Sequence, residues 1–268
     1  MFKFAANLTL LFQDSPFPER IERARVAGFR FVEFHNPHPY DHDLTRLATV
    51  VDRCGAQAIH FNFPCPGWDK GERGIAARPD LVAEFRAGVA TALEYARRLG
   101  CGQINCPVGN REVRFTLEEQ IQTLVQNLTY AAAELARQNI RLLLEPLNPI
   151  AHPNYLLTTT RSAVELQDRV GAPNIKIQYD YYQMQRSEGE LAATVRSILP
   201  RIGFVQVADN PGRHQPGTGE INFRFLLHDL ARLGYDDFVS LEYSETGRPD
   251  EWFGWIREYG LEEGLAFS

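Results

Sequence analysis

The stretch IKIQYD, residues 175–180, is a short run rich in β-branched and aromatic residues that ends in an acidic side chain. A run of this length and composition is typical of a β-strand. Three other runs carry an oxygen-bearing side chain at or near their ends, namely IRLLLE (140–145), FVQVAD (204–209) and FVSLE (238–242). We therefore predict parallel strands whose carboxyl ends bring Glu145, Asp180, Gln206 and Glu242 together.

Strand-like and helix-like runs alternate along the whole chain, which favours a parallel sheet with helical crossovers over a sandwich or a bundle. The strand candidates are Phe2–Asn7, Phe31–Phe34, Gln57–Phe61, Gln103–Cys106, Ile140–Glu145, Ile175–Asp180, Ile202–Ala208 and Phe238–Glu242. Eight strands in 268 residues match a single α/β (β/α)8 TIM barrel, for which about 250 residues are typical. We expect one domain over residues 1–268, because no linker rich in Pro, Gly or Ser divides the chain.

Helices between the strands are indicated by apolar residues at helical spacing. Two such stripes are formed by Leu81, Phe85, Val89, Leu93 and Ala96, and by Leu117, Ile121, Leu124, Leu128 and Leu135. Thr116 and Glu119 predict a capping box at the start of the second helix. Three glycines stand where helices should end, namely Gly28, Gly100 and Gly234.

Residues along a strand point alternately to its two faces. In residues 175–180 the outward, apolar set is Ile175, Ile177 and Tyr179, and the inward, polar set is Lys176, Gln178 and Asp180. The same alternation predicts Ser240 and Glu242 inside the barrel and Val239 and Leu241 outside. A polar interior is costly unless its groups are bonded, so a ligand or a metal ion is a natural partner for it.

Composition narrows the class of protein. The formal net charge of −6 argues against a nucleic-acid surface, which needs clustered Lys and Arg. The cysteines, Cys54, Cys65, Cys101 and Cys106, form no C-x-x-C pair, and the N-terminus does not resemble a secretory signal. We expect a cytoplasmic protein that acts on a small molecule, with no membrane span. Composition leaves a homo-oligomer open.

The carboxylates of Glu145, Asp180 and Glu242 would repel one another unless a cation lies among them. Together with Gln206 they form an all-oxygen ligand set, which suits Mg²⁺ or Mn²⁺ better than Zn²⁺. A single acidic residue at a strand end is more often a helix cap or an ion-pair partner. Four residues at matched positions favour a divalent metal site.

Three long loops follow strand candidates and carry the other candidate site residues. In residues 208–223, ADNPGRHQPGTGEINF, Arg213 is suited to hold a carboxylate or an oxyanion, and His214 either takes part or faces solvent. The loop FNFPCPGWDKGERGIA, residues 61–76, has His60 and Asn62 at its root and Trp68, Glu72 and Arg73 farther along, where Trp68 either covers a ligand or packs under its own loop. The loop at 146–157 supplies Asn148 and His152, each structural or substrate-binding.

Several segments are similar to hydroxypyruvate isomerases of the xylose isomerase-like TIM barrel superfamily. These segments are FAANLTLLF (4–12), GERGIA (71–76), HPNYLLTTT (152–160), NIKIQYDYYQMQRSEGEL (174–191) and VQVADNPGRHQPGTGEINF (205–223). The resemblance covers the chain from about Phe4 to Trp255. It implies that Glu145 and Glu242 are metal ligands and acid/base groups, that Asp180 and Gln206 complete the metal site, and that Arg213 contacts the substrate.

One position departs from the family. Its members commonly carry D-x-x-H after the sixth strand, whereas this chain has Gln183 in place of the histidine. Glutamine donates a hydrogen bond to a substrate but does not exchange a proton near neutral pH. If the histidine acts as an acid in the family, this protein is slower, altered in substrate choice or dependent on His214.

The resemblance implies interconversion of hydroxypyruvate and tartronate semialdehyde through an enediolate, with the two glutamates as acid and base; a hydride shift is the competing mechanism. Close alternatives are a 2-oxo-tetronate isomerase and a ketose 3-epimerase on the same site. A non-catalytic metabolite-binding barrel is a third hypothesis, motivated by Gln183. A DNA-repair endonuclease of the same superfamily would need many histidines at strand ends, whereas the seven here lie mostly in loops or helices.

Overall fold

Eight parallel strands close into a barrel in the computed structural model, which describes residues 2–249 and 251–265. Each strand pairs with the next along the chain, and β8 closes on β1. The strands are β1 (Lys3–Asn7), β2 (Phe31–Phe34), β3 (Gln57–Asn62), β4 (Gln103–Asn105), β5 (Arg141–Leu144), β6 (Ile175–Asp180), β7 (Ile202–Val207) and β8 (Phe238–Leu241). The predicted (β/α)8 barrel is confirmed, and all eight predicted strands are present to within two residues at each end.

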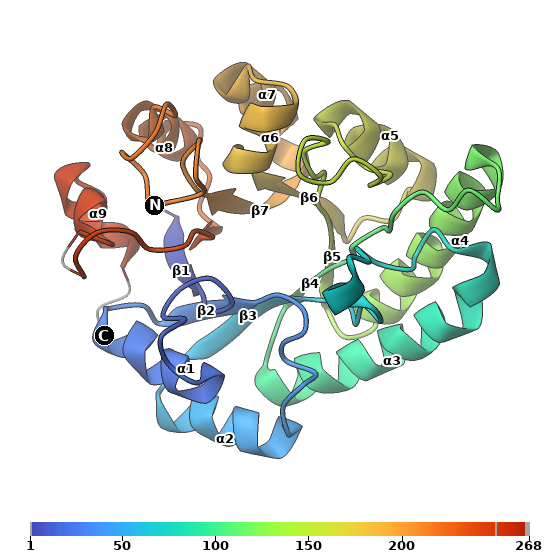
Figure 1. The fold of residues 1–268 in the computed structure, drawn as a ribbon, viewed down its shortest axis with the longest axis horizontal. Helices are drawn as coiled ribbons and strands as arrows, with labels where there is room; N and C mark the ends of the chain where they lie inside the picture. The colour runs from blue at the N-terminus through green and yellow to red at the C-terminus, as the bar shows by residue number, and fades with distance from the viewer. Residues whose placement is uncertain (1, 250, 266–268) are drawn as a thin grey trace.

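Helices form a ring outside the strands (Figure 1). They are α1 (Phe17–Val26), α2 (Leu44–Arg53), α3 (Val82–Leu99), α4 (Leu117–Ala136), α5 (Thr160–Val170), α6 (Tyr181–Ser187), α7 (Leu191–Ile198), α8 (Phe223–Arg232) and α9 (Gly254–Glu258). Short 3-10 turns are η1 (Trp68–Lys70), η2 (Pro79–Leu81), η3 (Leu199–Arg201) and η4 (Glu262–Gly264). None of the helices in the described residues has both the length and the hydropathy needed to cross a bilayer.

The helix boundaries follow the expected local signals. Thr116 caps α4, because its side chain accepts from the Glu119 backbone N–H while the Glu119 carboxylate accepts from the Thr116 backbone. Gly100 ends α3 in the left-handed region, with φ of 67°. The predicted capping box and this helix end are therefore both confirmed.

Two separate apolar groups stabilise the barrel. The larger one lies between strands and helices and contains the outward residues predicted for β6 and β8, such as Ile177 and Leu241. The smaller one fills the barrel interior and consists of Ala5, Phe31, Ile59, Leu143 and Phe204, with Phe238 packed against it. Polar inward residues lie on both sides of this second group: Arg141 contacts Gln103 and Asp237 near the starts of the strands, and the site residues lie at the carboxyl ends.

Candidate active site

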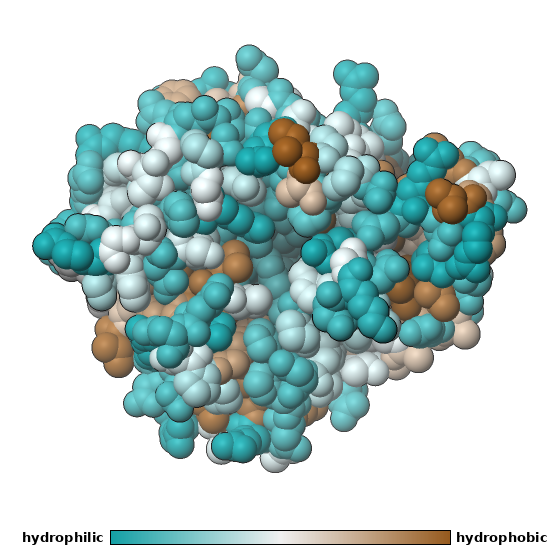
Figure 2. Space-filling model, in the orientation of Figure 1, coloured by the Kyte–Doolittle hydropathy of each residue, from teal (hydrophilic) through white to brown (hydrophobic). Residues whose placement is uncertain are grey.

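A cavity of about 250 Å³ opens among the loops at the carboxyl ends of the strands. The face of the molecule in Figure 2 is mostly hydrophilic and is hollowed near its centre. Of the predicted site residues, the cavity wall contains Glu145, Glu242, Arg213, Gln183, Asn62, Trp68 and His152. The wall also contains Arg73, which the sequence places in the loop after the third strand, and Thr9, His35, Asn36, Asn105 and Tyr155, which were not among the predicted site residues.

Three of the four predicted metal ligands converge. Oxygen atoms of Glu145, Asp180 and Glu242 lie within 4.8 Å of one another, and all three side chains are buried. Glu145 and Glu242 follow β5 and β8 by one residue, whereas Asp180 is the last residue of β6 and caps α6 by accepting from the Tyr182 N–H at 2.8 Å. The strand ends therefore place the carboxylates as the alternation of the sequence predicts.

Burial and mutual repulsion both act on these carboxylates. Burial, followed by the charges of Glu242 and Asp180, raises the pKa of Glu145 well above its usual range. Burial and the charge of Glu242 likewise raise the pKa of Asp180. Burial and like charge thus both oppose ionisation of these carboxyl groups, and a cation among them would relieve the repulsion.

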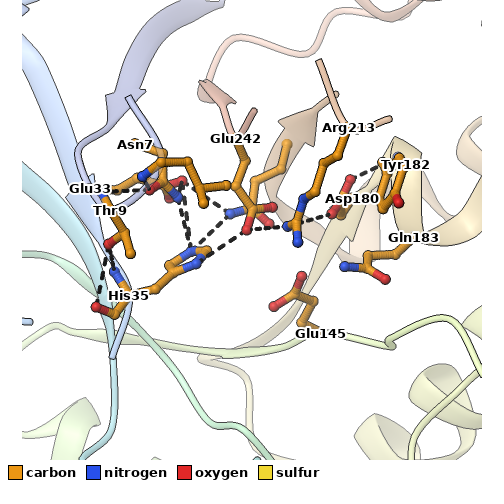
Figure 3. A network of polar contacts seen from close by, with 12 residues as sticks. Asn7, Thr9, Glu33, His35, Glu145, Asp180, Tyr182, Gln183, Arg213 and Glu242 are labelled. Carbon is orange, nitrogen blue, oxygen red and sulfur yellow. Dashed lines mark hydrogen bonds and ion pairs between the residues drawn. The ribbon is translucent and has the colours of Figure 1, made fainter. Parts of the chain in front are cut away.

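Arg213 is the cation that the protein itself supplies to this cluster. Its guanidinium lies 2.5 Å from Glu242 Oε1 and 3.8 Å from Asp180 Oδ2, and Figure 3 shows it pointing between these two groups. The ring of Tyr182 lies beneath it, 5.3 Å from the guanidinium carbon to the ring centroid. The predicted Arg213 therefore lies within the cavity wall and beside the carboxylates.

Gln206 lies in a different set of contacts. Its side-chain oxygen accepts from Gln178 at 2.6 Å, and its amide nitrogen donates to Glu33 at 3.1 Å. The structure thus does not direct the Gln206 oxygen at the three carboxylates, because two neighbours in the barrel interior complete its hydrogen bonds. Its role as a fourth ligand stays a prediction.

A buried polar network adjoins the carboxylates. It contains the predicted His60 and Gln206 together with Asn7, Glu33 and His35, which were not predicted as site residues. Glu33 accepts from Asn7 at 2.6 Å and contacts His60 Nδ1 at 3.0 Å, and His35 Nδ1 lies 3.2 Å from Glu242 Oε1. Burial opposes the charge of Glu33, but the contacts with His60, His35 and Gln206 outweigh it and lower its pKa to about 2. Burial lowers the pKa of His35 to about 4, so this ring is neutral at pH 7.

The sequence contained a signal for this network. In FVEFH, residues 31–35, Val32 and Phe34 belong to the outer apolar group, so Glu33 and His35 alternate inward. An acidic residue inside an apolar strand is expensive to bury without partners, and this cost marks Glu33 as part of an internal site.

Gln183 is fixed by Asn148, another residue suggested by the sequence. The Gln183 side-chain oxygen accepts from the backbone N–H of Asn148 at 3.0 Å and from its side-chain amide at 2.5 Å. Since a backbone N–H can only donate, the orientation of the Gln183 amide is settled. The side-chain nitrogen of Gln183 therefore points toward the cavity (Figure 3).

The loop after β3 brings Trp68 and Arg73 to the cavity, with the Arg73 guanidinium carbon 4.3 Å from the Trp68 ring centroid. Gly74 holds this loop close to Pro107, because a side chain on Gly74, at φ 110°, would approach the Pro107 carbonyl oxygen to 1.8 Å. Trp68 therefore lies at the cavity wall, as one of the two sequence interpretations expects.

Besides Asp180, Gln206 and Asn148, three further predicted residues lie outside this wall. His60 is fully buried below it and stacks on Phe204 with ring centroids 4.7 Å apart. His214 contacts the Ser244 carbonyl through Nδ1 at 2.9 Å. Glu72 packs its side chain near Gly67. The structure does not bring these three side chains to the cavity, because His60 lies in the interior, Glu72 packs within its own loop and His214 contacts the loop after β8.

The model of the xylose isomerase-like TIM barrel family matches residues 21–267. The chain is 44% identical to hydroxypyruvate isomerase of Escherichia coli, over 97% of this chain and 100% of that one. It is 35% identical to 2-oxo-tetronate isomerase of Haemophilus influenzae, over 97% of this chain and 100% of the relative. The chain therefore belongs to the xylose isomerase-like TIM barrel family.

Solved structures agree with this assignment. A crystal structure described as an AP endonuclease, family 2, from Brucella melitensis superposes with a TM-score of 0.92 at 36% identity, covering 97% of this chain and 99% of that one. The 3-keto-D-glucoside 4-epimerase of E. coli shares the fold, with a TM-score of 0.80 at 18% identity, over 96% and 100% of the two chains. Within the family, the protein is a hydroxypyruvate isomerase-like enzyme.

Proposed function

We propose that the protein is a metal-dependent isomerase that interconverts hydroxypyruvate and tartronate semialdehyde. The observation that carries the proposal is the convergence of Glu145, Asp180 and Glu242 beside a cavity of about 250 Å³. A cavity of this size suits a small sugar acid. The 44% identity to a hydroxypyruvate isomerase supports the choice of substrate.

The carboxylate cluster fits a hard divalent cation. Asp180 Oδ2 and Glu242 Oε2 are buried, and neither has a hydrogen-bond partner within the described part of the chain. Oxygen-only ligands favour Mg²⁺ or Mn²⁺. When bound, such an ion supplies Lewis-acid stabilisation of negative charge on the substrate oxygens. We keep Gln206 as the proposed fourth ligand, because it pairs in register with Asp180.

Glu145 and Glu242 are the proposed acid and base. One glutamate removes a proton from C3 of hydroxypyruvate, the carbon that bears the hydroxyl group. The other delivers a proton to C2, the carbonyl carbon, while the hydroxyl proton moves from the C3 oxygen to the C2 oxygen. The product carries an aldehyde at C3 and a hydroxyl group at C2. Burial raises the pKa of Glu145 above that of an ordinary glutamate, and buried carboxyl groups of this kind serve as acids and bases in catalysis.

The remaining cavity residues bind and orient the substrate in this proposal. Arg213 and Arg73 are the guanidinium groups of the wall and would receive the substrate carboxylate. The Gln183 amide nitrogen and Asn62 offer hydrogen bonds to its other oxygens, and Trp68 and His152 exclude water. His60, Glu72 and His214 would act only through neighbouring residues.

The alternative substrate is a 2-oxo-tetronate, which adds one carbon. Relatives at 35% and 36% identity are named for that activity. A ketose 3-epimerase has weaker support, since structures of that name share 18% to 22% identity and indicate the fold alone. The non-catalytic metabolite-binding barrel is motivated by Gln183, whose amide does not exchange a proton near neutral pH, and absence of turnover would favour it. An endonuclease is disfavoured by the net charge of −6 and the carboxylate-lined cavity.

The test is turnover of hydroxypyruvate, 2-oxo-tetronates and free ketoses by purified protein, before and after metal removal, with metal analysis of the protein. We expect hydroxypyruvate turnover that chelation abolishes and Mg²⁺ or Mn²⁺ restores. Glu145→Gln should lower kcat by at least about 100-fold, whereas the exposed Glu118→Gln should leave it unchanged. Equal turnover by the Glu145→Gln and unsubstituted proteins would exclude the proposal.

We also propose that residues 1–268 act as one cytoplasmic domain. The barrel uses strands from Lys3 to Leu241, and the four cysteines form no disulfide. A reducing compartment is compatible with free thiols of this kind.

A further inference from the structure

We propose a second metal site, separate from the carboxylate cluster and not required by the isomerase reaction, that binds a divalent transition-metal ion such as Zn²⁺ through His38, Asp41 and His42. The three residues lie in the loop between β2 and α2. Their ligand atoms lie within 4.8 Å of one another.

The distances among the three atoms match one face of a tetrahedral site. Asp41 Oδ1 lies 2.8 Å from His38 Nδ1 and 3.3 Å from His42 Nε2, and the two ring nitrogens lie 3.1 Å apart. Bonds of about 2.0–2.1 Å to Zn²⁺ place tetrahedral ligands about 3.3 Å apart. An outward movement of less than about 0.6 Å would therefore admit the ion, with a fourth position open to water.

The protein alone satisfies these three atoms poorly. If both ring nitrogens carry a proton and donate to Asp41, the two N–H groups face each other at 3.1 Å. If only one carries a proton, that proton serves both the carboxylate and the other ring. A metal ion would accept the lone pairs of both neutral rings and of the carboxylate at once.

Phe17 fixes the orientation of both rings. Its ring stacks on His38, with centroids 3.7 Å apart and planes at 19°, and on His42, at 4.8 Å and 8°. Both histidines thus already present their nitrogens to the same point, so little side-chain freedom remains to be lost when an ion binds.

The surroundings admit and favour a cation. Asp41 and His42 line a groove of about 780 Å³ that gives access from the surface. The groove carries four carboxylates, of Glu19, Glu22, Asp41 and Asp43, against two guanidinium groups, of Arg46 and Arg53. Two imidazoles favour Zn²⁺, Cu²⁺ or Ni²⁺ over Mg²⁺, so the two sites of the molecule should select different ions.

The test is calorimetric titration of the full chain, purified without metal, with Zn²⁺ alone. The unsubstituted protein should bind one more equivalent than Asp41→Asn, which preserves the side-chain shape, and His42→Gln should lose the same equivalent. Removing a group that only supports a ligand costs about 10–100-fold in affinity, so losing a ligand should weaken this site at least tenfold. His228→Gln, an exposed histidine on α8, is the matched control and should bind like the unsubstituted protein.

Co²⁺ gives a second measurement that does not depend on activity. Imidazole ligation in a tetrahedral site gives strong visible absorption, which should appear in the unsubstituted protein and be absent from Asp41→Asn. Melting in the absence of metal shows that each variant is folded. Identical Zn²⁺ stoichiometry and affinity in the unsubstituted, Asp41→Asn and His42→Gln proteins would overturn the site. Loss of hydroxypyruvate turnover would bear on the proposed function alone.

Discussion

At the scale of single residues, the partners of a polar side chain fix its chemical form. His35 Nε2 lies 3.1 Å from the amide nitrogen of Asn7 and 3.3 Å from that of Gln206. Amide nitrogens donate, so Nε2 accepts and the ring proton is on Nδ1, facing Glu242. His35 therefore donates to one of the two proposed acid/base groups and restricts its orientation.

Substitution of Gln183 should separate its structural role from its role toward the substrate. Gln183→Leu removes the acceptor of the Asn148 N–H and should cost about 1–3 kcal/mol in the free energy of unfolding. Gln183→Glu keeps an acceptor oxygen but replaces the amide N–H by negative charge beside the carboxylates. We expect Gln183→Glu to lower kcat/KM more than stability, measured by steady-state kinetics and denaturant unfolding. Unchanged kcat/KM in Gln183→Glu would show that the amide nitrogen does not contact substrate.

His152 should titrate well below an ordinary histidine. Burial, together with the charges of Arg73 and Arg213, lowers its pKa to about 4. Between pH 6.5 and 4 the His152 ring therefore binds fewer protons in the folded protein than in the unfolded chain. The contribution of neutral His152 to the free energy of unfolding is complete above pH 6.5 and is lost as the pH falls toward 4. NMR titration of the ring should show a midpoint near 4.

The matched variant for this titration is His152→Gln. Between pH 7 and 5 it should lose less unfolding free energy than the unsubstituted protein, by under about 2 kcal/mol because the ring is partly exposed. A His152 midpoint near 6.5 would contradict the expectation.

At the scale of elements, one carboxylate organises the long loop after β7. Asp209 Oδ2 accepts from the backbone N–H groups of Gly217 and Gly219, each at 2.9 Å, and Oδ1 accepts from Ile221 at 3.0 Å. The backbone N–H of Arg213 in turn donates to the backbone carbonyl of Asp209 at 3.0 Å. Asp209 therefore holds the loop in the shape that directs Arg213 to the cavity.

Asp209→Ala should release this loop. Hydrogen bonds to a charged acceptor contribute about 1.5–3 kcal/mol each, so we expect a loss of at least about 2 kcal/mol in unfolding free energy and a raised KM. Limited proteolysis should cut within residues 209–221 faster than in the unsubstituted protein. Asp236→Ala, an exposed acidic residue before β8, should change neither measurement. A loop as resistant as before would show that Asp209 is dispensable.

The sequence predicted the elements better than their contacts. The strands were found because β-branched and apolar residues mark each one. The predicted strands end at Glu145 and Glu242, whereas in the structure each glutamate lies one residue past its strand. The convergence of the three carboxylates followed from their shared position at strand ends. The orientation of Gln206 could not be predicted, because it depends on Gln178 and Glu33 in neighbouring strands.

At the scale of the whole molecule, packing separates the thiols. Cys65, Cys101 and Cys106 are buried, whereas Cys54 is partly exposed. Burial raises the pKa of Cys65 to about 11 and that of Cys101 to about 12. We expect a thiol reagent at neutral pH to label Cys54 quickly and the other three only as fast as the protein unfolds. Mass spectrometry of labelled peptides measures this, and rapid labelling of Cys106 would contradict the packing.

The apolar side chains that fill the barrel around Phe31 and Phe204 also affect how small molecules reach the carboxylates. Within the described residues, this apolar group fills the barrel interior, and the cavity beside the carboxylates opens at the carboxyl ends of the strands. We therefore expect substrate and product to enter and leave by this opening. Substrate and product then compete for the same opening of the cavity. Substrate should competitively inhibit the reverse reaction, and product the forward reaction. A compound that stays bound in the opening should inhibit both directions.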